Sequence, residues 1–186
     1  GGSNADIVIA DAYIKGIEGI DWNMALEACL KNADVPPGDN EEAEGRGGLI
    51  EYNSLGYIPY GIDRAGNRTV EYSYCDYAIY QLADGLGKKD LAERFLRQSS
   101  NWKNLWRSDY EYGGVKGFIM PRDRNGNWMD EVYGLYPEHK KFLYTPVTNE
   151  AWKYSSNWQV FFYEGTSWQY SLAIPHDVPG LIELCG

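Results

Sequence analysis

One carboxylic acid, Glu164, stands among aromatic side chains in the segment 161–170 and is the first candidate for chemistry. Aromatic residues fill five of the ten positions in this segment. Burial against rings disfavours the charged form of a carboxyl group and raises its pKa. Such a group can donate a proton at neutral pH, which predicts a general acid. The alternative is an ordinary loop and helix N-cap, because Glu-Gly-Thr-Ser before an apolar run is typical of that structure as well.

Ligands for a transition metal are scarce in this chain. Its histidines are His139 and His176, too few for a histidine-rich site. The three cysteines, Cys29, Cys75 and Cys185, are widely spaced in apolar helical contexts and contain no Cys-x-x-Cys pair. We therefore expect buried free thiols and no disulfide framework or zinc site. An oxygen-ligated cation such as calcium stays open.

Length and composition indicate one domain with a large aromatic content. The chain has 186 residues, seven Trp and sixteen Tyr, and a net charge of −10. This charge argues against nucleic acid, which requires a basic patch. The aromatic side chains fit either a carbohydrate-stacking surface or an aromatic core. Residues 1–5 resemble an expression tag, and no run is apolar enough to cross a membrane, so we expect no membrane partner.

Helical periodicity predicts the elements that would position Glu164. We expect helices over 22–32, capped by Asp21 and closed by Asn32, and over 49–57, ending at Gly56. Two long helices, 70–86 and 88–106, are separated by so short a connection that they should be antiparallel neighbours. A final helix is expected from Ser167 to Leu184, interrupted at Pro175.

Glycine-rich turns and aromatic loops fill most of the rest. The segments 63–67 and 123–127 are near copies with turn chemistry, and neither has the ligand spacing of an EF-hand. Asn125-Gly126 between two apolar runs predicts a β-hairpin. Helical hairpins with long loops on one side favour a mainly α fold, a helical toroid whose loops build a pocket.

Six motifs occur in order along the chain: WNMAL (22–26), GRGGL (45–49), LGYIP (55–59), VEYSYCDY (70–77), GFIMPR (117–122), and EGTSWQY (164–170) with PHD (175–177). In this order they resemble glycoside hydrolase family 92, the calcium-dependent exo-α-mannosidases. The resemblance implies that residues 6–186 are part of an (α/α)6 toroid that serves as the catalytic domain of a periplasmic or secreted bacterial enzyme. It also implies inverting hydrolysis of terminal α-mannosides of glycans, with calcium at the subsite of the mannose that is cleaved.

The resemblance assigns roles to residues of the last motifs. Glu164 matches the family's general acid. Trp168, Gln169 and Tyr170 are expected beside the sugar, and Gln169 is also expected to bind calcium. The family's Gly-Asn-Ala is Gly-Thr-Ser here, which removes the asparagine side chain from that position.

The Pro-His-Asp segment is the other part of the expected substrate site. It contributes His176 and Asp177, for which capping and hydrogen bonding behind the site are favoured over direct chemistry.

The sequence has no match to the family's base motif, although an inverting glycosidase needs a second carboxylate. We therefore expect the chain to be part of a larger enzyme, inactive by itself. A carbohydrate-binding module and a structural helical domain without a ligand are the alternatives. Because an incomplete toroid leaves apolar surface uncovered, we expect self-association or segment exchange, unless the aromatic loops fold back to give a monomer.

Overall fold

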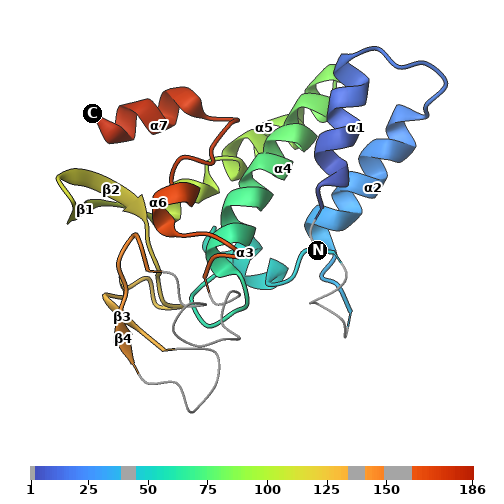
Figure 1. Cartoon of the computed structure of the whole chain (residues 1–186). Coiled ribbons are helices and arrows are strands. Elements are labelled where there is room, and N and C mark those ends of the chain that lie inside the picture. The colour runs from blue at the N-terminus through green and yellow to red at the C-terminus, as the bar shows by residue number, and fades with distance from the viewer. Residues whose placement is uncertain (1–2, 39–44, 134–140, 149–160) are drawn as a thin grey trace.

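The computed structural model of the chain describes residues 3–38, 45–133, 141–148 and 161–186, and these are mainly helical (Figure 1). The α-helices are α1 (Ala5–Ile14), α2 (Trp22–Asp34), α3 (Leu49–Leu55), α4 (Ala65–Gly85), α5 (Lys89–Gln98), α6 (Ser167–Tyr170) and α7 (Val178–Cys185), and Asn101–Leu105 forms the 3-10 helix η1. The strands are β1 (Trp106–Tyr112), β2 (Val115–Ile119), β3 (Glu131–Val132) and β4 (Phe142–Leu143), paired β1 with β2 and β3 with β4, both antiparallel.

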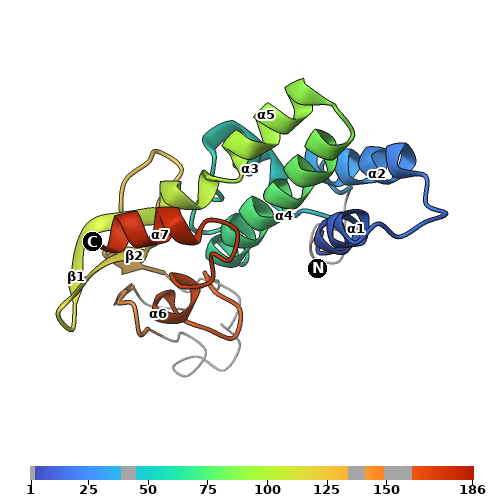
Figure 2. The ribbon, with the colours of Figure 1, turned by 90° about the horizontal axis from the view of Figure 1, so that it is seen from above.

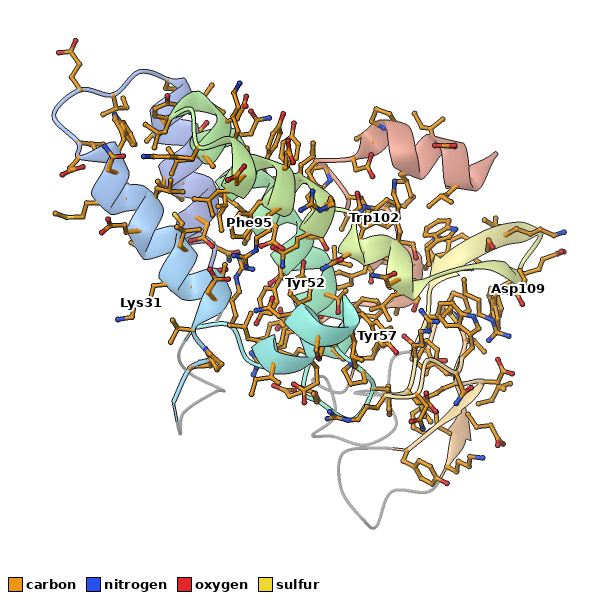
Figure 3. The ribbon with its side chains drawn as sticks, turned by 180° about the vertical axis from the view of Figure 1, so that it is seen from behind. Lys31, Tyr52, Tyr57, Phe95, Trp102 and Asp109 are labelled. Carbon is orange, nitrogen blue, oxygen red and sulfur yellow. The ribbon has the colours of Figure 1, made fainter. Side chains whose placement is uncertain are left out.

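Helix α4 is the central element. Helices α1 and α2 lie on one side of it, and the β1–β2 hairpin, α6 and α7 lie on the other (Figures 1 and 2). A smaller apolar core joins α2, α4 and α5, and a larger one runs from α3 and the start of α4 to the hairpin and the loop before α6. Tyr52, Phe95 and Trp102 are fully buried side chains of this interior (Figure 3).

A buried ionic network ties the N-terminal helix to the centre of the fold. The Arg46 guanidinium donates to Asp76 at 2.6 Å, to Asp6 at 3.1 Å and to the Ser3 hydroxyl at 2.7 Å. The Arg46 side chain is 1% exposed, and those of Asp6 and Asp76 are 0% exposed. Burial alone lowers the pKa of Arg46, but Asp76 and, less strongly, Cys75 and Tyr52 together outweigh burial and raise that pKa. Residues 1–5, expected to be a tag, thus include a buried member, and their origin stays a prediction.

Two helix predictions are confirmed, and their caps explain why. The Asp21 carboxylate accepts from the backbone N–H groups of Asn23 and Met24, both at 3.1 Å, as an N-cap should. The expected stop at Asn32 is wrong, because α2 continues to Asp34. Helix α3 ends where expected, at Gly56, whose φ of +75° is the left-handed conformation that glycine adopts without strain.

The two central helices are antiparallel neighbours as predicted, but their bounds differ. Helix α4 begins at Ala65, five residues before the predicted start. The single helix predicted over 88–106 is wrong: α5 ends at Gln98, η1 follows, and Trp106 begins β1. The Ser99 hydroxyl donates to the Leu96 carbonyl at 2.7 Å, a local bond that competes with helix continuation.

The predicted hairpin is only partly confirmed. Asn125-Gly126 does form a tight turn, with Gly126 at φ +86°, but a single bridge, Arg122 to Trp128, flanks it. The longer hairpin is β1–β2, closed by two left-handed glycines, Gly113 and Gly114, which suit a two-residue turn.

Other predictions of the sequence are confirmed in part. Cys29 and Cys75 are buried free thiols, and burial raises the pKa of each to about 12, whereas Cys185 is exposed, so its predicted burial is wrong. The single interrupted helix expected over 167–184 is two separate helices, α6 and α7. The helical hairpins fit part of a toroid, but the described residues do not close into a ring, so the toroid stays a prediction.

Candidate active site

Glu164 is exposed, in the loop that leads into α6. Its φ of +52° lies in the left-handed region, which residues other than glycine adopt at a free-energy cost of about 1–3 kcal/mol. Within the described residues, the other non-glycine residue with positive φ is Arg64. The central carbon of the Arg64 guanidinium lies 5.4 Å from the centroid of the Tyr163 ring, and Tyr163 directly precedes Glu164. A contact through Tyr163 therefore links the two residues with left-handed backbones.

Two side chains hold the backbone of Tyr163, the residue before Glu164. The Asn67 amide oxygen accepts from the Tyr163 N–H, and the Tyr170 hydroxyl donates to the Tyr163 carbonyl at 2.9 Å. The Asn67 amide nitrogen also donates to the Tyr170 hydroxyl at 2.5 Å. Both polar groups of the Tyr163 backbone are thus fixed by two side chains that bond to each other. We call Asn67 and Tyr170 the loop clamp.

Aromatic packing attaches the same loop to the first turn of α4. The rings of Phe162 and Tyr170 stack at 4.5 Å, and the Phe161 carbonyl accepts from the Gly66 N–H at 2.9 Å. A Cβ at Gly66 would lie 2.7 Å from the Phe162 ring, closer than real contacts allow. The close approach of loop and helix therefore requires glycine at this position.

The acid beside this loop that burial does perturb is Glu71, which the sequence interpretation missed. It is half-buried on α4, one turn after Asn67, whose amide nitrogen lies 3.4 Å from its carboxylate. Burial raises the pKa of Glu71. The expected burial of Glu164 is wrong, because the surrounding rings pack against each other and leave its side chain in solvent. Glu71 stands beside the apolar stripe of α4 in the sequence, and that position could have identified it.

Trp168 is 38% exposed and lies against the β1–β2 hairpin. Its ring centroid is 5.4 Å from that of Phe118 and 6.4 Å from that of Tyr112. An open groove of about 620 Å³ between the hairpin, α6 and α7 is lined by Trp168, and Glu164 is not among its lining residues. Trp168 is therefore available for stacking, but the groove is separate from the carboxylate.

Gln169 has a structural task in α6. Its side-chain oxygen accepts from the Thr166 N–H at 3.1 Å, which forms one half of a capping box. Calcium takes six to eight oxygen ligands. Within the described ranges, no group of three or more His, Cys, Asp or Glu side chains could hold a metal ion. The described residues therefore offer no cluster of acidic side chains around Gln169, and calcium binding by Gln169 stays a prediction.

His176 and Asp177 anchor the segment between α6 and α7. The His176 Nε2 atom lies 2.9 Å from the Ser99 carbonyl oxygen, the ring stacks on Tyr74, and burial lowers its pKa. The Asp177 carboxylate accepts from the Gly180 N–H at 3.0 Å and pairs with Lys103 at 2.9 Å. This geometry agrees with the expected capping and hydrogen bonding, whereas substrate contact stays a prediction.

Tryptophan exposure also bears on the alternatives considered from the sequence. Trp102 and Trp106 are buried, whereas Trp168 is exposed, so a purely structural domain that buries every tryptophan does not describe this chain. Trp152, Trp158 and His139 lie outside the described residues. None of the helices that the structure describes combines the length and apolar character needed to cross a membrane.

Comparisons with known proteins show which family this chain resembles in sequence and fold. A model of the glycosyl hydrolase family 92 catalytic domain matches residues 1–186. An uncharacterized secreted glycosidase of the fungus Arthroderma benhamiae is 41% identical over 201 residues, which cover 100% of this chain and 24% of that protein.

Solved structures of two enzymes from Bacteroides thetaiotaomicron are also similar. The family GH92 inverting mannosidase BT2199 is 30% identical, with a TM-score of 0.80 over 98% of this chain and 21% of that one. The α-mannosidase BT3965, in complex with mannoimidazole, is 30% identical, with a TM-score of 0.76 over 100% of this chain and 21% of that one. The chain thus spans about a quarter of the length of the fungal relative and about a fifth of the solved mannosidases.

Proposed function

This chain belongs to glycoside hydrolase family 92, and we propose that it is part of the catalytic domain of an inverting exo-α-mannosidase that removes terminal mannose from glycans. The observation that supports the substrate is the likeness, over nearly the whole chain, to two mannosidases, one of which holds mannoimidazole. The family model describes a catalytic domain, which does not favour an independent carbohydrate-binding module.

Glu164 is proposed as the general acid. Its carboxyl proton would pass to the glycosidic oxygen as the bond between that oxygen and the anomeric carbon breaks. A water molecule, deprotonated by a second carboxylate, would attack the anomeric carbon from the opposite face and invert its configuration. A bound glycan would cover the exposed Glu164 side chain and exclude bulk water from the proton transfer.

The neighbouring side chains would bind and orient the sugar. Trp168 offers an exposed ring face four residues after Glu164, suited to stacking against a sugar. Tyr170 has its hydroxyl committed to Asn67 and Tyr163, which favours a supporting role for it. Calcium is proposed for the full-length enzyme, since the described part of the chain holds no group of three or more His, Cys, Asp or Glu side chains that could bind a metal ion. Secretion is supported by the name of the fungal relative, and a bacterial origin stays a prediction.

The experiment is hydrolysis of an α-mannoside by the full-length enzyme, followed by proton NMR of the first product formed. We expect α-mannoside hydrolysis with initial release of β-mannose, because a single displacement inverts the anomeric carbon. Initial release of α-mannose would contradict the inverting mechanism, and failure to cleave any α-mannoside would contradict the substrate class. The isolated chain is expected to be inactive, since it would protonate the leaving group without a base to activate water.

A further inference from the structure

We propose that Asn67, together with the Tyr170 hydroxyl, positions Glu164 for proton transfer by holding its backbone in the left-handed conformation. This inference rests on the proposed role of Glu164 as general acid. Asn67 is a positioning residue in this proposal, because it acts through Glu164 and has no contact with the reacting atoms.

The contacts of Asn67 are specific to its amide group. Its side chain lies in the first turn of α4, and the residue is 4% exposed, so its bonds to the loop are shielded from water. The oxygen accepts from the Tyr163 N–H, and the nitrogen donates to the Tyr170 hydroxyl. A side chain with only donors or only acceptors could not make both contacts.

The clamp acts on the peptide unit that sets the direction of the Glu164 side chain. The Tyr163 carbonyl belongs to the peptide bond that precedes Glu164, and it accepts from the Tyr170 hydroxyl at 2.9 Å. That peptide plane is one of the two planes that define the φ rotation of Glu164, which is +52°, so holding it restricts this rotation. A left-handed residue other than glycine persists only when its surroundings enforce it, and such residues gather at active sites.

Two variants of the full-length enzyme test the clamp. Asn67→Ala removes both amide contacts, and Tyr170→Phe removes the hydroxyl while it keeps the ring stacked on Phe162. Each has a matched control elsewhere in the fold. Asn104→Ala removes an amide bond to the Gly56 carbonyl at 2.9 Å, and Tyr57→Phe removes a hydroxyl bond to the Asp123 carbonyl at 2.8 Å.

The readout is kcat on two α-mannosides, one with an alkyl leaving group and one with an activated aryl leaving group. Misplacement of a catalytic group by about 1 Å can lower the rate on the order of 100-fold. We expect Asn67→Ala to lower kcat on the alkyl mannoside by about 10- to 100-fold, with a much smaller loss on the aryl mannoside and little change in KM. Tyr170→Phe should lower kcat on the alkyl mannoside by roughly 2- to 10-fold. In the controls, any loss of kcat should be equal for the two leaving groups.

Combining each clamp variant with Glu164→Gln separates this inference from the proposed function. If Asn67 acts through Glu164, Asn67→Ala should cause little further loss once the carboxyl group is gone, because the two effects are not independent. Losses that multiply, or equal losses on both leaving groups in the clamp variants, would overturn the positioning role. Equal losses on both leaving groups for Glu164→Gln alone would instead overturn the assignment of Glu164 as the acid.

Discussion

Replacing Arg46 by methionine is expected to destabilise the fold strongly, because it leaves two buried carboxylates without a cation. Asp6 would keep a bond from the Asn32 amide at 3.1 Å, and Asp76 would keep one from the Tyr52 hydroxyl at 2.8 Å. These neutral donors do not compensate a buried charge. Removal of one partner from a buried ion pair destabilises by about 3–5 kcal/mol, against a total of about 5–15 kcal/mol for a typical domain.

Urea unfolding of the chain, followed by tryptophan fluorescence, measures this loss. With a slope of about 2 kcal/mol per molar urea, the midpoint should fall by roughly 1.5–2.5 M. Arg124→Met is the matched control, since Arg124 pairs with Glu51 at 2.9 Å but has a side chain that is 64% exposed. Loss of that surface pair should lower the unfolding free energy by less than about 1 kcal/mol.

A comparable, small loss for Arg46→Met and Arg124→Met would refute the reasoning, because it would mean that Asp6 and Asp76 are not held as buried charges by Arg46. A triple variant tests the cause. Adding Asp6→Asn and Asp76→Asn to Arg46→Met removes the uncompensated charges, so it should recover part of the lost stability.

Three further substitutions have expected outcomes. Burial lowers the pKa of His176 below its usual 6.5, so the unfolded chain binds a proton at a higher pH than the folded chain does. The unfolding free energy should therefore fall as pH drops below 6.5. In urea titrations at several pH values, His176→Gln should flatten this decline. Burial raises the pKa of Glu71, so the contribution of this side chain to stability is present at low pH and is lost as pH rises through the folded pKa. Glu71→Gln should therefore be more stabilising at pH 7 than at pH 4. The opposite order would contradict the burial argument. Gly66→Ala should displace Phe162 and lower the unfolding free energy by about 1–3 kcal/mol, and an unchanged urea midpoint would show that the loop yields without strain.

Much of the helical framework could be predicted because its signals are local. Asp21 caps α2 through its own side chain, and Gly56 ends α3 through its own φ angle, so each boundary depends on residues close in sequence. No such local signal marks helix α1, because residues 7–10 are all apolar and show no helical period. The charged residue of its first turn, Asp6, is buried, which the local sequence does not indicate. That burial depends on Arg46, forty residues away.

The candidate site was harder to predict because burial depends on how distant segments meet. The aromatic residues around Glu164 suggested a buried acid, but Phe161 and Phe162 turn toward α4 and leave Glu164 outside. Glu71 is half-buried because the loop packs over the first turns of the same helix. Asn67 bonds to residues 96 and 103 positions away, a pairing that no local pattern indicates.

The most direct test of the account is to compare Glu164→Gln with Glu71→Gln in the full-length enzyme, using one alkyl and one activated aryl α-mannoside. We predict that Glu164→Gln lowers kcat on the alkyl mannoside by about 10²- to 10⁴-fold and far less on the aryl mannoside, because only the alkyl leaving group needs protonation. Glu71→Gln should change both by less than about tenfold. A leaving-group-dependent loss in Glu71→Gln, with equal losses on both substrates in Glu164→Gln, would contradict the assignment of Glu164 as the general acid.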